Sequence, residues 1–306
     1  MKNNLKYKHI LKAVANEVWG IEPQKLQQIM AFLELKANGG TVSEDDIEAV
    51  TQAKSRPSKN ASGTVAVLPL RGTIVHRSDA IGESSGMMGI ERFMSSFRAS
   101  VADPAVKSIV IDVDSPGGTV PGVPEAATEI FNAREKKHIV AIANSMSASA
   151  AYWLATAADE LVVTPSGSVG SVGVFTVHED YSEYMEDRGI KTTYISAGDY
   201  KVEANPFEPL SSEAQEYLQQ SVQETYTEFV NALAKHRGIS AKDVKENYGK
   251  GRMLSAKAAL KAGMVDRIDT LDGVLSRLGV SSAASGVRSN AISKQQAVAR
   301  LDILSK

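Results

Sequence analysis

The chain has 306 residues, 43% of them hydrophobic, which is enough to bury a full core in one or two domains. Its 34 basic and 36 acidic residues are mixed along the sequence and give a formal net charge of -2, so no basic field is expected to hold a nucleic acid or an anionic membrane surface. The absence of cysteine excludes disulfides, thiolate nucleophiles and cysteine metal sites, and it fits a reducing cytoplasm.

Residues 1–62 predict a helical extension followed by a linker. Apolar residues recur at helical spacing from Leu5 to Trp19, and Pro23 can open a second helix that ends near Gly40. The polar segment from Gln52 to Gly63 is typical of a linker. The N-terminus lacks the apolar region of a signal peptide, and no run reaches the roughly 18–20 apolar residues of a membrane helix, so we expect a cytoplasmic protein without a membrane anchor.

Beyond residue 63, short apolar runs alternate with helical ones, the pattern of repeated βα units in an α/β fold with a mostly parallel sheet. The predicted strands are Thr64–Leu70, Ser108–Val113, His138–Ala143, Glu160–Val163, Gly173–Val177 and Lys191–Ile195. The predicted helices between them are Ile90–Val101, Val123–Lys136, Ala150–Ala157 and Glu179–Asp187. Right-handed crossovers would bring the strand ends to one edge of the sheet, where we expect the chemistry.

The C-terminal third predicts more helices around this sheet. A long helix over Ser212–Arg237 has an apolar stripe that covers the sheet or an interface. Ser240 and Ser255 can each cap a shorter helix, and Met264–Ile268 is strand-like. With a flexible tail over 281–306, the expected organisation is an extension at 1–62, one main domain at 63–280 and the tail.

An apolar strand from Ile109 runs directly into the sequence Ser-Pro-Gly-Gly at positions 115 to 118. Gly117 and Gly118 can adopt positive φ, and their backbone N–H groups can point at an oxyanion. The alternative is an ordinary tight turn between a strand and a helix. The motif therefore predicts an oxyanion loop only if a nucleophile lies beside it.

A second segment, Ala141–Ala155, places three serines among alanines where a strand turns into a helix. Ser149 sits at the junction, where the amides of the first helical turn can stabilise developing negative charge. Its alternative roles are helix N-capping and close packing. Ser145 and Ser147 are rival nucleophiles.

A serine nucleophile needs a base, which is usually a histidine. None of the five histidines stands in a recognisable triad motif: His9, His76, His138, His178 and His236. The alternative base is a lysine that an apolar pocket keeps uncharged. Lys201 follows a predicted strand and is flanked by aromatic and proline residues, although most lysines are solvated surface groups.

Taken in order, these segments resemble the serine-lysine peptidase family of signal peptide peptidases and phage prohead (head maturation) proteases, which has a Clp-protease/crotonase-like fold. Asp114–Gly118 resembles the family's oxyanion loop, Ser147–Tyr152 its nucleophile turn, and Gly198–Lys201 its base segment. The segment Ser166–Val174 resembles a further family signature. The resemblance covers roughly residues 63 to 280.

The resemblance implies a Ser-Lys dyad made of Ser149 as nucleophile and Lys201 as base, with Ser171 bonded to the lysine. It implies an oxyanion hole formed by Gly118 and Ala150 with Gly117. It also implies a homo-oligomer that needs no metal and no other cofactor.

Two departures from the family pattern affect the predicted site. Ala150 and Ala151 stand where the family commonly has glycines, which predicts a narrower pocket beside Ser149. Asp114 stands where the family often has asparagine, and its carboxylate would disfavour an oxyanion unless it is paired.

Without an anchor, and with the extension at residues 1–62, the chain resembles the head-maturation peptidases of tailed phages. Its expected substrates are then capsid, portal or scaffold proteins, in the host cytoplasm or inside the prohead. The alternatives are a cytoplasmic protease like the signal peptide peptidases, a crotonase-type acyl-CoA enzyme, and a non-catalytic capsid assembly protein.

Overall fold

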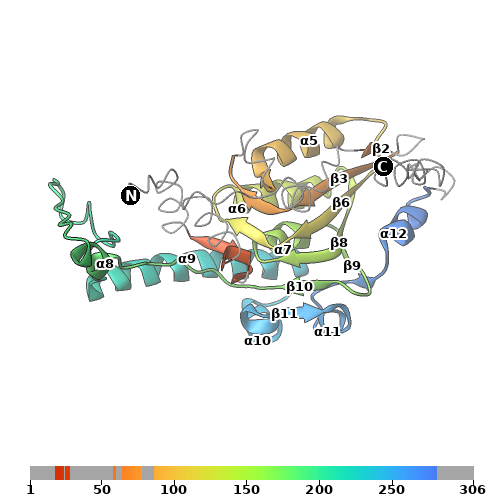
Figure 1. The fold of residues 1–306 in the computed structure, drawn as a ribbon. Coiled ribbons are helices and arrows are strands. Elements are labelled where there is room, and N and C mark those ends of the chain that lie inside the picture. Colours follow the sequence, from red (N-terminus) through yellow and green to blue (C-terminus); the bar gives the residue numbers. More distant parts are fainter. Residues whose placement is uncertain (1–17, 24, 28–57, 60–63, 78–85, 281–306) are drawn as a thin grey trace, which may run out of the picture.

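A computed structural model describes residues 18–23, 25–27, 58–59, 64–77 and 86–280. Its larger sheet has the strand order β11-β10-β8-β6-β3-β2, with β9 beside β8 and β12 beside β9 (Figure 1). These strands are β2 (Ser58–Lys59), β3 (Val65–Arg71), β6 (Ser108–Ser115), β8 (His138–Ala148), β9 (Glu160–Val163), β10 (Ser168–Gly170), β11 (Met253–Ser255) and β12 (Arg267–Ile268).

A smaller sheet of four strands adjoins the larger one and has the order β1-β7-β4-β5. Its strands are β1 (Trp19–Ile21), β4 (Thr73–Val75), β5 (Met87–Gly89) and β7 (Gly117–Thr119). Strand β4 runs parallel to β5 and β7, whereas β1 is antiparallel to β7.

The central strands β3, β6, β8 and β9 pair in parallel, which confirms the predicted α/β fold with a mostly parallel sheet. Both faces of these strands are covered. Ile109 and Ile111 of β6 face the larger apolar cluster, whereas Val110 faces a smaller cluster on the other side. Because successive side chains alternate between two buried faces, the strands read as almost continuous apolar runs.

Helices cover both faces of the sheet. The larger cluster takes side chains from α5 (Ile90–Ala102), α6 (Val123–Ala133), α7 (Ala150–Thr156) and α9 (Ser212–Arg237). On the opposite face, α12 (Leu271–Arg277) packs Val274 against the valines of β3, β6, β8 and β9. The helices α10 (Ala241–Asn247) and α11 (Ala256–Lys261), with the short 3-10 turn Gly249–Gly251, flank β11.

Most predicted elements are confirmed within one to three residues, and the predicted bounds of β9 and α9 are those observed. The strand β8 continues through Ala148, well past its predicted end. Ser240 caps α10, with its hydroxyl accepting from the amide of Asp243 at 3.0 Å. Ser255 precedes α11, but its side chain makes no capping bond.

Two predicted strands are wrong. Gly173–Val177 contains only an isolated bridge between Phe175 and Trp19, and Lys191–Ile195 has no strand conformation, with the Ile195 side chain almost fully exposed. Their β-branched composition suits strands, but a strand also needs a neighbour to take its backbone hydrogen bonds. The C-terminal end of β8 pairs instead with β10, formed by residues for which no strand was predicted.

The N-terminal predictions are partly outside the described residues. Trp19, predicted as the end of a helix, lies in β1, so the helix prediction is wrong at that residue. The conformation is helical at Pro23 and over residues 25–27, as predicted. Within the predicted linker, Ser58–Lys59 forms β2 on the edge of the sheet. The rest of the extension and the tail at 281–306 lie outside the described part.

Residues 176–211, which include α8 (Ser182–Asp187), lie beside the outer end of α9, away from the sheet (Figure 1). We call these residues, with the first half of α9, the arm. The arm carries most of the large apolar side chains that the described part exposes, including Tyr184, Ile190, Tyr194, Ile195, Tyr200 and Tyr217. No helix in the described ranges, α9 included, is long and apolar enough to cross a bilayer.

Candidate active site

The site is built on the sharp turn between β8 and α7, where Ser149 stands alone between the two elements. Its φ of 52° and ψ of -117° are unusual for a residue with a side chain. A backbone of this kind costs about 1–3 kcal/mol and persists only where the surroundings impose it. A strained strand-to-helix turn is also the way in which other hydrolases expose a nucleophile at the end of a sheet.

The Ser149 hydroxyl does not cap the helix that it precedes. It makes no capping bond to α7 and instead donates to the carbonyl of Gly173 at 3.2 Å. Its backbone N–H donates to the carbonyl of Gly170 at 2.8 Å. The capping alternative is therefore excluded, and the hydroxyl lies beside the amides of the first turn of α7.

Helix α7 is buried along its whole length, which fixes the turn before it. The Tyr152 hydroxyl donates to the carbonyl of Met264 at 2.8 Å, and the ring of Trp153 stacks on Phe229 with centroids 4.5 Å apart. The strained turn is thus held by the core of the protein.

Gly117 and Gly118, which were predicted as a loop, begin strand β7 and approach this turn so closely that side chains would not fit. Gly117 has a φ of 94°, and a Cβ there would lie 2.9 Å from the Ala148 carbonyl oxygen and 3.1 Å from the Ala150 nitrogen. A Cβ at Gly118 would overlap the backbone of Ile74. The two glycines therefore serve close approach of the backbone to the serine turn.

Ser115 organises the start of this loop. Its hydroxyl donates to the carbonyl of Gly72 at 2.7 Å and accepts from the amide of Gly117 at 3.2 Å. Because the Gly117 amide is bonded to the Ser115 side chain, it is not free to donate to an oxyanion.

The carboxylates near the loop are both bonded. Asp114 accepts from the hydroxyl of Ser145 at 2.7 Å. Asp112 is almost buried, pairs with Arg71 and accepts from the side chain of Asn144 at 3.0 Å. The Asp114 carboxylate thus has a hydrogen-bond partner beside the proposed oxyanion hole.

The other candidate serines have different surroundings. Ser145 is bonded to Asp114, and Ser147 is fully buried within β8, opposite Ser115 and Val169. Ser171 directly follows Gly170, has a φ of 53° and is nearly buried, so it lies close to the Ser149 turn.

Lys201 lies in the arm and is exposed. It lines a hollow of about 920 Å³ together with Tyr194, Tyr200, Glu213 and Tyr217. The Tyr200 hydroxyl donates to the Glu213 carboxylate at 3.0 Å, which ties this segment to the first turn of α9.

Within one chain, Lys201 is far from Ser149. Glu213 precedes Phe229, which stacks on α7, by 16 positions on the same helix, a distance of roughly 24 Å along the axis at 1.5 Å per residue. The structure therefore brings Ser149, Ala150, Gly117, Gly118 and Ser171 together, and it places Lys201 elsewhere.

The histidines of the described part have their contacts elsewhere: His76 with Glu91, His138 with Asp159, His178 with Asn205 and His236 with Thr156. Burial lowers the pKa of His236 to about 4, helped by the positive charges of Lys235 and Arg134. His9 lies outside the described residues. None of these contacts of the described histidines brings a base to Ser149.

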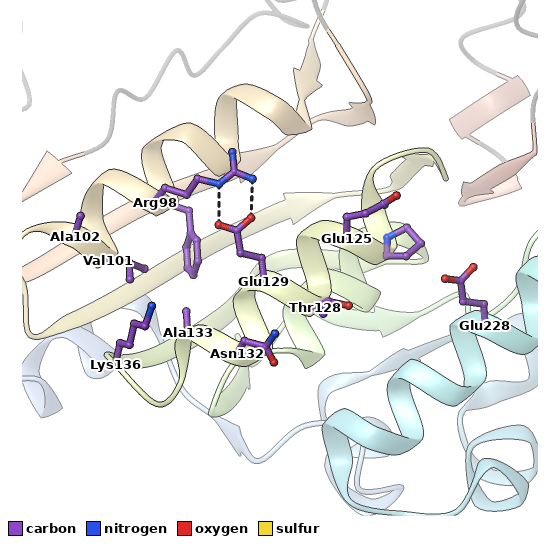
Figure 2. A pocket seen from close by; sticks show the side chains of 12 residues that line it. Arg98, Val101, Ala102, Glu125, Thr128, Glu129, Asn132, Ala133, Lys136 and Glu228 are labelled. Carbon is purple, nitrogen blue, oxygen red and sulfur yellow. Dashed lines mark hydrogen bonds and ion pairs between the residues drawn. The ribbon is translucent and has the colours of Figure 1, made fainter.

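A second hollow of about 960 Å³ lies between α5 and α6 and contains none of the predicted site residues (Figure 2). Arg98 of α5 forms two hydrogen bonds, of 2.7 Å and 2.6 Å, to the Glu129 carboxylate of α6 across it. This bidentate pair joins two surface helices and has no link to the serine turn.

One neighbour of Ser149 was missed by the sequence analysis. A Cβ on Gly20 would lie 3.4 Å from the Ser149 hydroxyl oxygen and 3.5 Å from the Ala150 nitrogen. The available signal was a glycine between two large apolar residues, Trp19 and Ile21, which alternates as a strand does. The strand was missed because the apolar residues before it recur at helical spacing, which favoured a helix up to Trp19.

The sequence of residues 132–285, half of the chain, matches the family described as Peptidase family S49. The chain belongs to this family. The matched region contains the β8–α7 turn, Ser171 and the arm, so S49 membership rests on the part of the chain that carries Ser149 and Lys201. It confirms the predicted resemblance.

Among curated proteins, this S49 chain is similar to capsid assembly protease C of Escherichia phage lambda, at 32% identity over 81% of this chain and 58% of that protein. It is 28% identical to the head-tail preconnector protein GP5 of Enterobacteria phage P21, over 88% of this chain and 56% of that protein. It is also 28% identical to Protease 4 of Salmonella typhi, over 71% of this chain and 34% of that protein. The chain thus spans little more than half the length of the two phage relatives.

Proposed function

We propose that this chain is a serine endopeptidase in which Ser149 is the nucleophile and Lys201 the general base. The observation that carries the proposal is the strained Ser149 turn. Its hydroxyl does not cap α7, and Gly117 approaches the residues on both sides of Ser149 so closely that a side chain on Gly117 would not fit. Membership of a peptidase family supports the same assignment.

The proposed reaction needs only groups that the protein supplies. Neutral Lys201 takes the Ser149 proton as the hydroxyl oxygen attacks a peptide carbonyl, and the Gly118 and Ala150 amides stabilise the oxyanion. The protonated lysine gives its proton to the leaving amine, and the neutral lysine then activates the water that releases the acyl group. Ser171 is proposed to hold the lysine amine. No metal or other cofactor takes part.

We propose further that a second copy of the chain supplies Lys201. The arm places the lysine roughly 24 Å along α9 from the helix that follows Ser149. The same arm exposes Tyr184, Tyr194 and Ile195, which an oligomer would bury. Covering the lysine with a second copy would remove water from its amine, and desolvation favours the uncharged form that a base requires.

The proposed substrates are proteins of a phage head, such as capsid, portal or scaffold proteins, cleaved in the host cytoplasm or within the prohead. This part of the proposal rests on the names of the two phage relatives, a capsid assembly protease and a head-tail preconnector protein. Co-expression of the wild type with such proteins should give processed fragments that intact-mass measurement detects. The Ser149→Ala variant should give none, and fragments that persist with it would contradict the proposal.

Cleavage of a fluorescent casein by purified protein tests the chemistry directly. Replacing a catalytic serine by alanine lowers turnover on the order of 10⁶-fold in a well-studied serine protease, so Ser149→Ala should be inactive, as should Lys201→Ala. Thermal unfolding should stay cooperative in both variants. Retained turnover in Ser149→Ala would reject Ser149 as the nucleophile, and a wild type without turnover would favour a non-catalytic assembly protein.

Mixing the two inactive variants tests the origin of the lysine. If Lys201 comes from a second copy, co-refolded Ser149→Ala and Lys201→Ala chains should regain activity, in about a quarter of the sites for random mixing of symmetric copies. A lysine from the same chain predicts no recovery. The matched control mixes Lys201→Ala with a Ser149→Ala, Lys201→Ala double variant and should stay inactive.

A further inference from the structure

Strand β1 lies across the serine turn and is hydrogen-bonded on both of its edges. On one side it pairs antiparallel with β7, and the amide of Glu22 donates to the carbonyl of Pro116 at 2.8 Å. On the other side Trp19 exchanges both backbone hydrogen bonds with Phe175, at 2.7 Å and 3.1 Å. An extended segment held between two backbone edges is a common way for a protein to bind a peptide strand.

The register places the Gly20 carbonyl at the oxyanion donors. Because backbone groups of successive strand residues point to opposite sides, and Trp19 faces Phe175, the N–H and C=O of Gly20 face its β7 partner Gly118. The Gly20 oxygen overlaps the point where a Cβ of Gly117 would stand, and that point is 3.1 Å from the Ala150 nitrogen. The carbonyl thus enters the space between the two proposed donor residues.

The residues on either side of Gly20 anchor the strand. Trp19 and Ile21 are almost completely buried and form a separate small cluster with Leu26 and Phe175. This cluster is distinct from the two clusters that cover the central sheet. The segment is therefore fixed by side-chain contacts of its own on both sides of the glycine.

We propose that Trp19–Ile21 is an internal substrate of this protein, cleaved at the Gly20–Ile21 peptide bond. The inference rests on the proposed peptidase function. The Ser149 oxygen forms an ester with the Gly20 carbonyl carbon, the bond to the Ile21 nitrogen breaks, and that nitrogen takes the serine's proton through Lys201. Water then hydrolyses the ester, which restores the Ser149 hydroxyl and leaves a carboxylate on Gly20 and a new amino terminus at Ile21.

The same geometry assigns a preference for a small residue before the cleaved bond. A Cβ on Gly20 meets the Ser149 oxygen at 3.4 Å and the Ala150 Cβ at 3.5 Å, which are ordinary van der Waals contacts. A methyl group therefore fits, and we expect a larger side chain to crowd the nucleophile or the first residue of α7. Ala150, which stands where the family commonly has glycine, supplies one wall of this subsite.

Because the lysine is proposed to come from a second copy, a single chain contains the nucleophile, the oxyanion donors and the bound strand, but lacks the base. Self-cleavage should therefore follow assembly. The rate per chain should rise with protein concentration, at least until assembly is complete, instead of being constant as for cleavage within an isolated chain.

The test is intact mass and N-terminal sequencing of the purified full chain after incubation. The wild type should yield a product that begins at Ile21, and Ser149→Ala should not. Gly20→Ala, the matched control, should be cleaved within about threefold of the wild-type rate, because its methyl group makes only ordinary contacts. Gly20→Phe should lose cleavage at this bond while keeping a cooperative unfolding transition.

Casein turnover by the same preparations separates the two proposals. If the protein cleaves casein but its Gly20–Ile21 bond stays intact, the internal-substrate proposal is wrong and the proposed peptidase function is retained. The same holds if Gly20→Phe is cleaved at this bond as fast as the wild type. A preparation that cleaves neither casein nor itself at any concentration rejects both. If Gly20→Phe does not fold, a synthetic peptide with the sequence of residues 15–26 replaces it in the test. Added in excess to the wild type, this peptide must be cut between its glycine and its isoleucine, and an uncut peptide overturns the proposal.

Discussion

The two halves of α9 share one continuous helical backbone but differ in how far their side chains are buried. The second half buries Phe229, Val230 and Leu233 in the core, next to α7. The first half extends into the arm, where Tyr217 is exposed and Leu218 only half-buried. One continuous helix thus joins a rigid region, which holds Ser149, to a region that presents Lys201 and uncovered aromatic side chains.

The difference shows where each half of the proposed dyad obtains its environment. The serine turn carries strain, and only a packed core can hold a strained backbone in place. The lysine needs a dry surrounding, which the single chain does not provide for the exposed Lys201. The sheet and the helices packed on it, which we call the body, hold the serine turn within a single chain. The arm leaves Lys201 exposed and needs a partner to cover it. This difference fits a site assembled from two copies.

The largest expected effect is a difference in the free energy of unfolding between variants in the two halves of α9. Phe229→Ala removes the stack on Trp153 and leaves a cavity, so it should lower the free energy of unfolding by about 3–5 kcal/mol. Tyr217→Ala, at an exposed position of the same helix, should change it by less than about 0.5 kcal/mol. Urea unfolding of the two variants checks this, and equal losses would mean that the arm packs as tightly as the body.

The body should also lose stability in mild acid through His236. Burial holds the pKa of His236 at about 4, below the 6.5 of an unfolded chain, so the folded state favours the neutral ring. The stabilisation is complete above pH 6.5 and is lost as the pH falls towards 4, by about 3 kcal/mol in total. Denaturant unfolding at several pH values should show this slope in the wild type, and His236→Gln should flatten it.

A smaller effect concerns the strained turn itself. Ser149→Gly and Ser149→Ala both remove the hydroxyl, but only glycine tolerates a φ of 52° and a ψ of -117° without cost. The free energy of unfolding should therefore be about 1–2 kcal/mol higher for the glycine variant than for the alanine variant. Equal melting curves would show that the turn is not strained in solution.

The smallest effect tests two serines that look alike in sequence. Ser240→Ala removes a capping box at the start of α10 and should cost about 1 kcal/mol. Ser255→Ala should cost much less, because the Ser255 side chain makes no capping bond to α11. Equal losses in urea unfolding would contradict this difference.

The local structure of the body could be predicted because its signals are local. The apolar runs of β3, β6, β8 and β9 and the stripes of α5 and α6 reflect the periodicity with which each element meets the core. The turn at Ser149 was predicted in the same way, from small residues between a strand and a helix. The false strand at Lys191–Ile195 shows the limit, because composition cannot reveal whether a neighbouring edge exists.

The sequence by itself determined the α/β fold, the pair of glycines after β6 and the serine at the helix start, since steric limits and side-chain periodicity act between residues that are close along the chain. Only the tertiary structure decided that Gly20 lies over Ser149 and that Lys201 lies away from it within one chain. The physical reason is that backbone edges pair with any complementary strand that reaches them. Which strand arrives depends on the packing of residues about a hundred positions apart, as between Gly20 and Gly118.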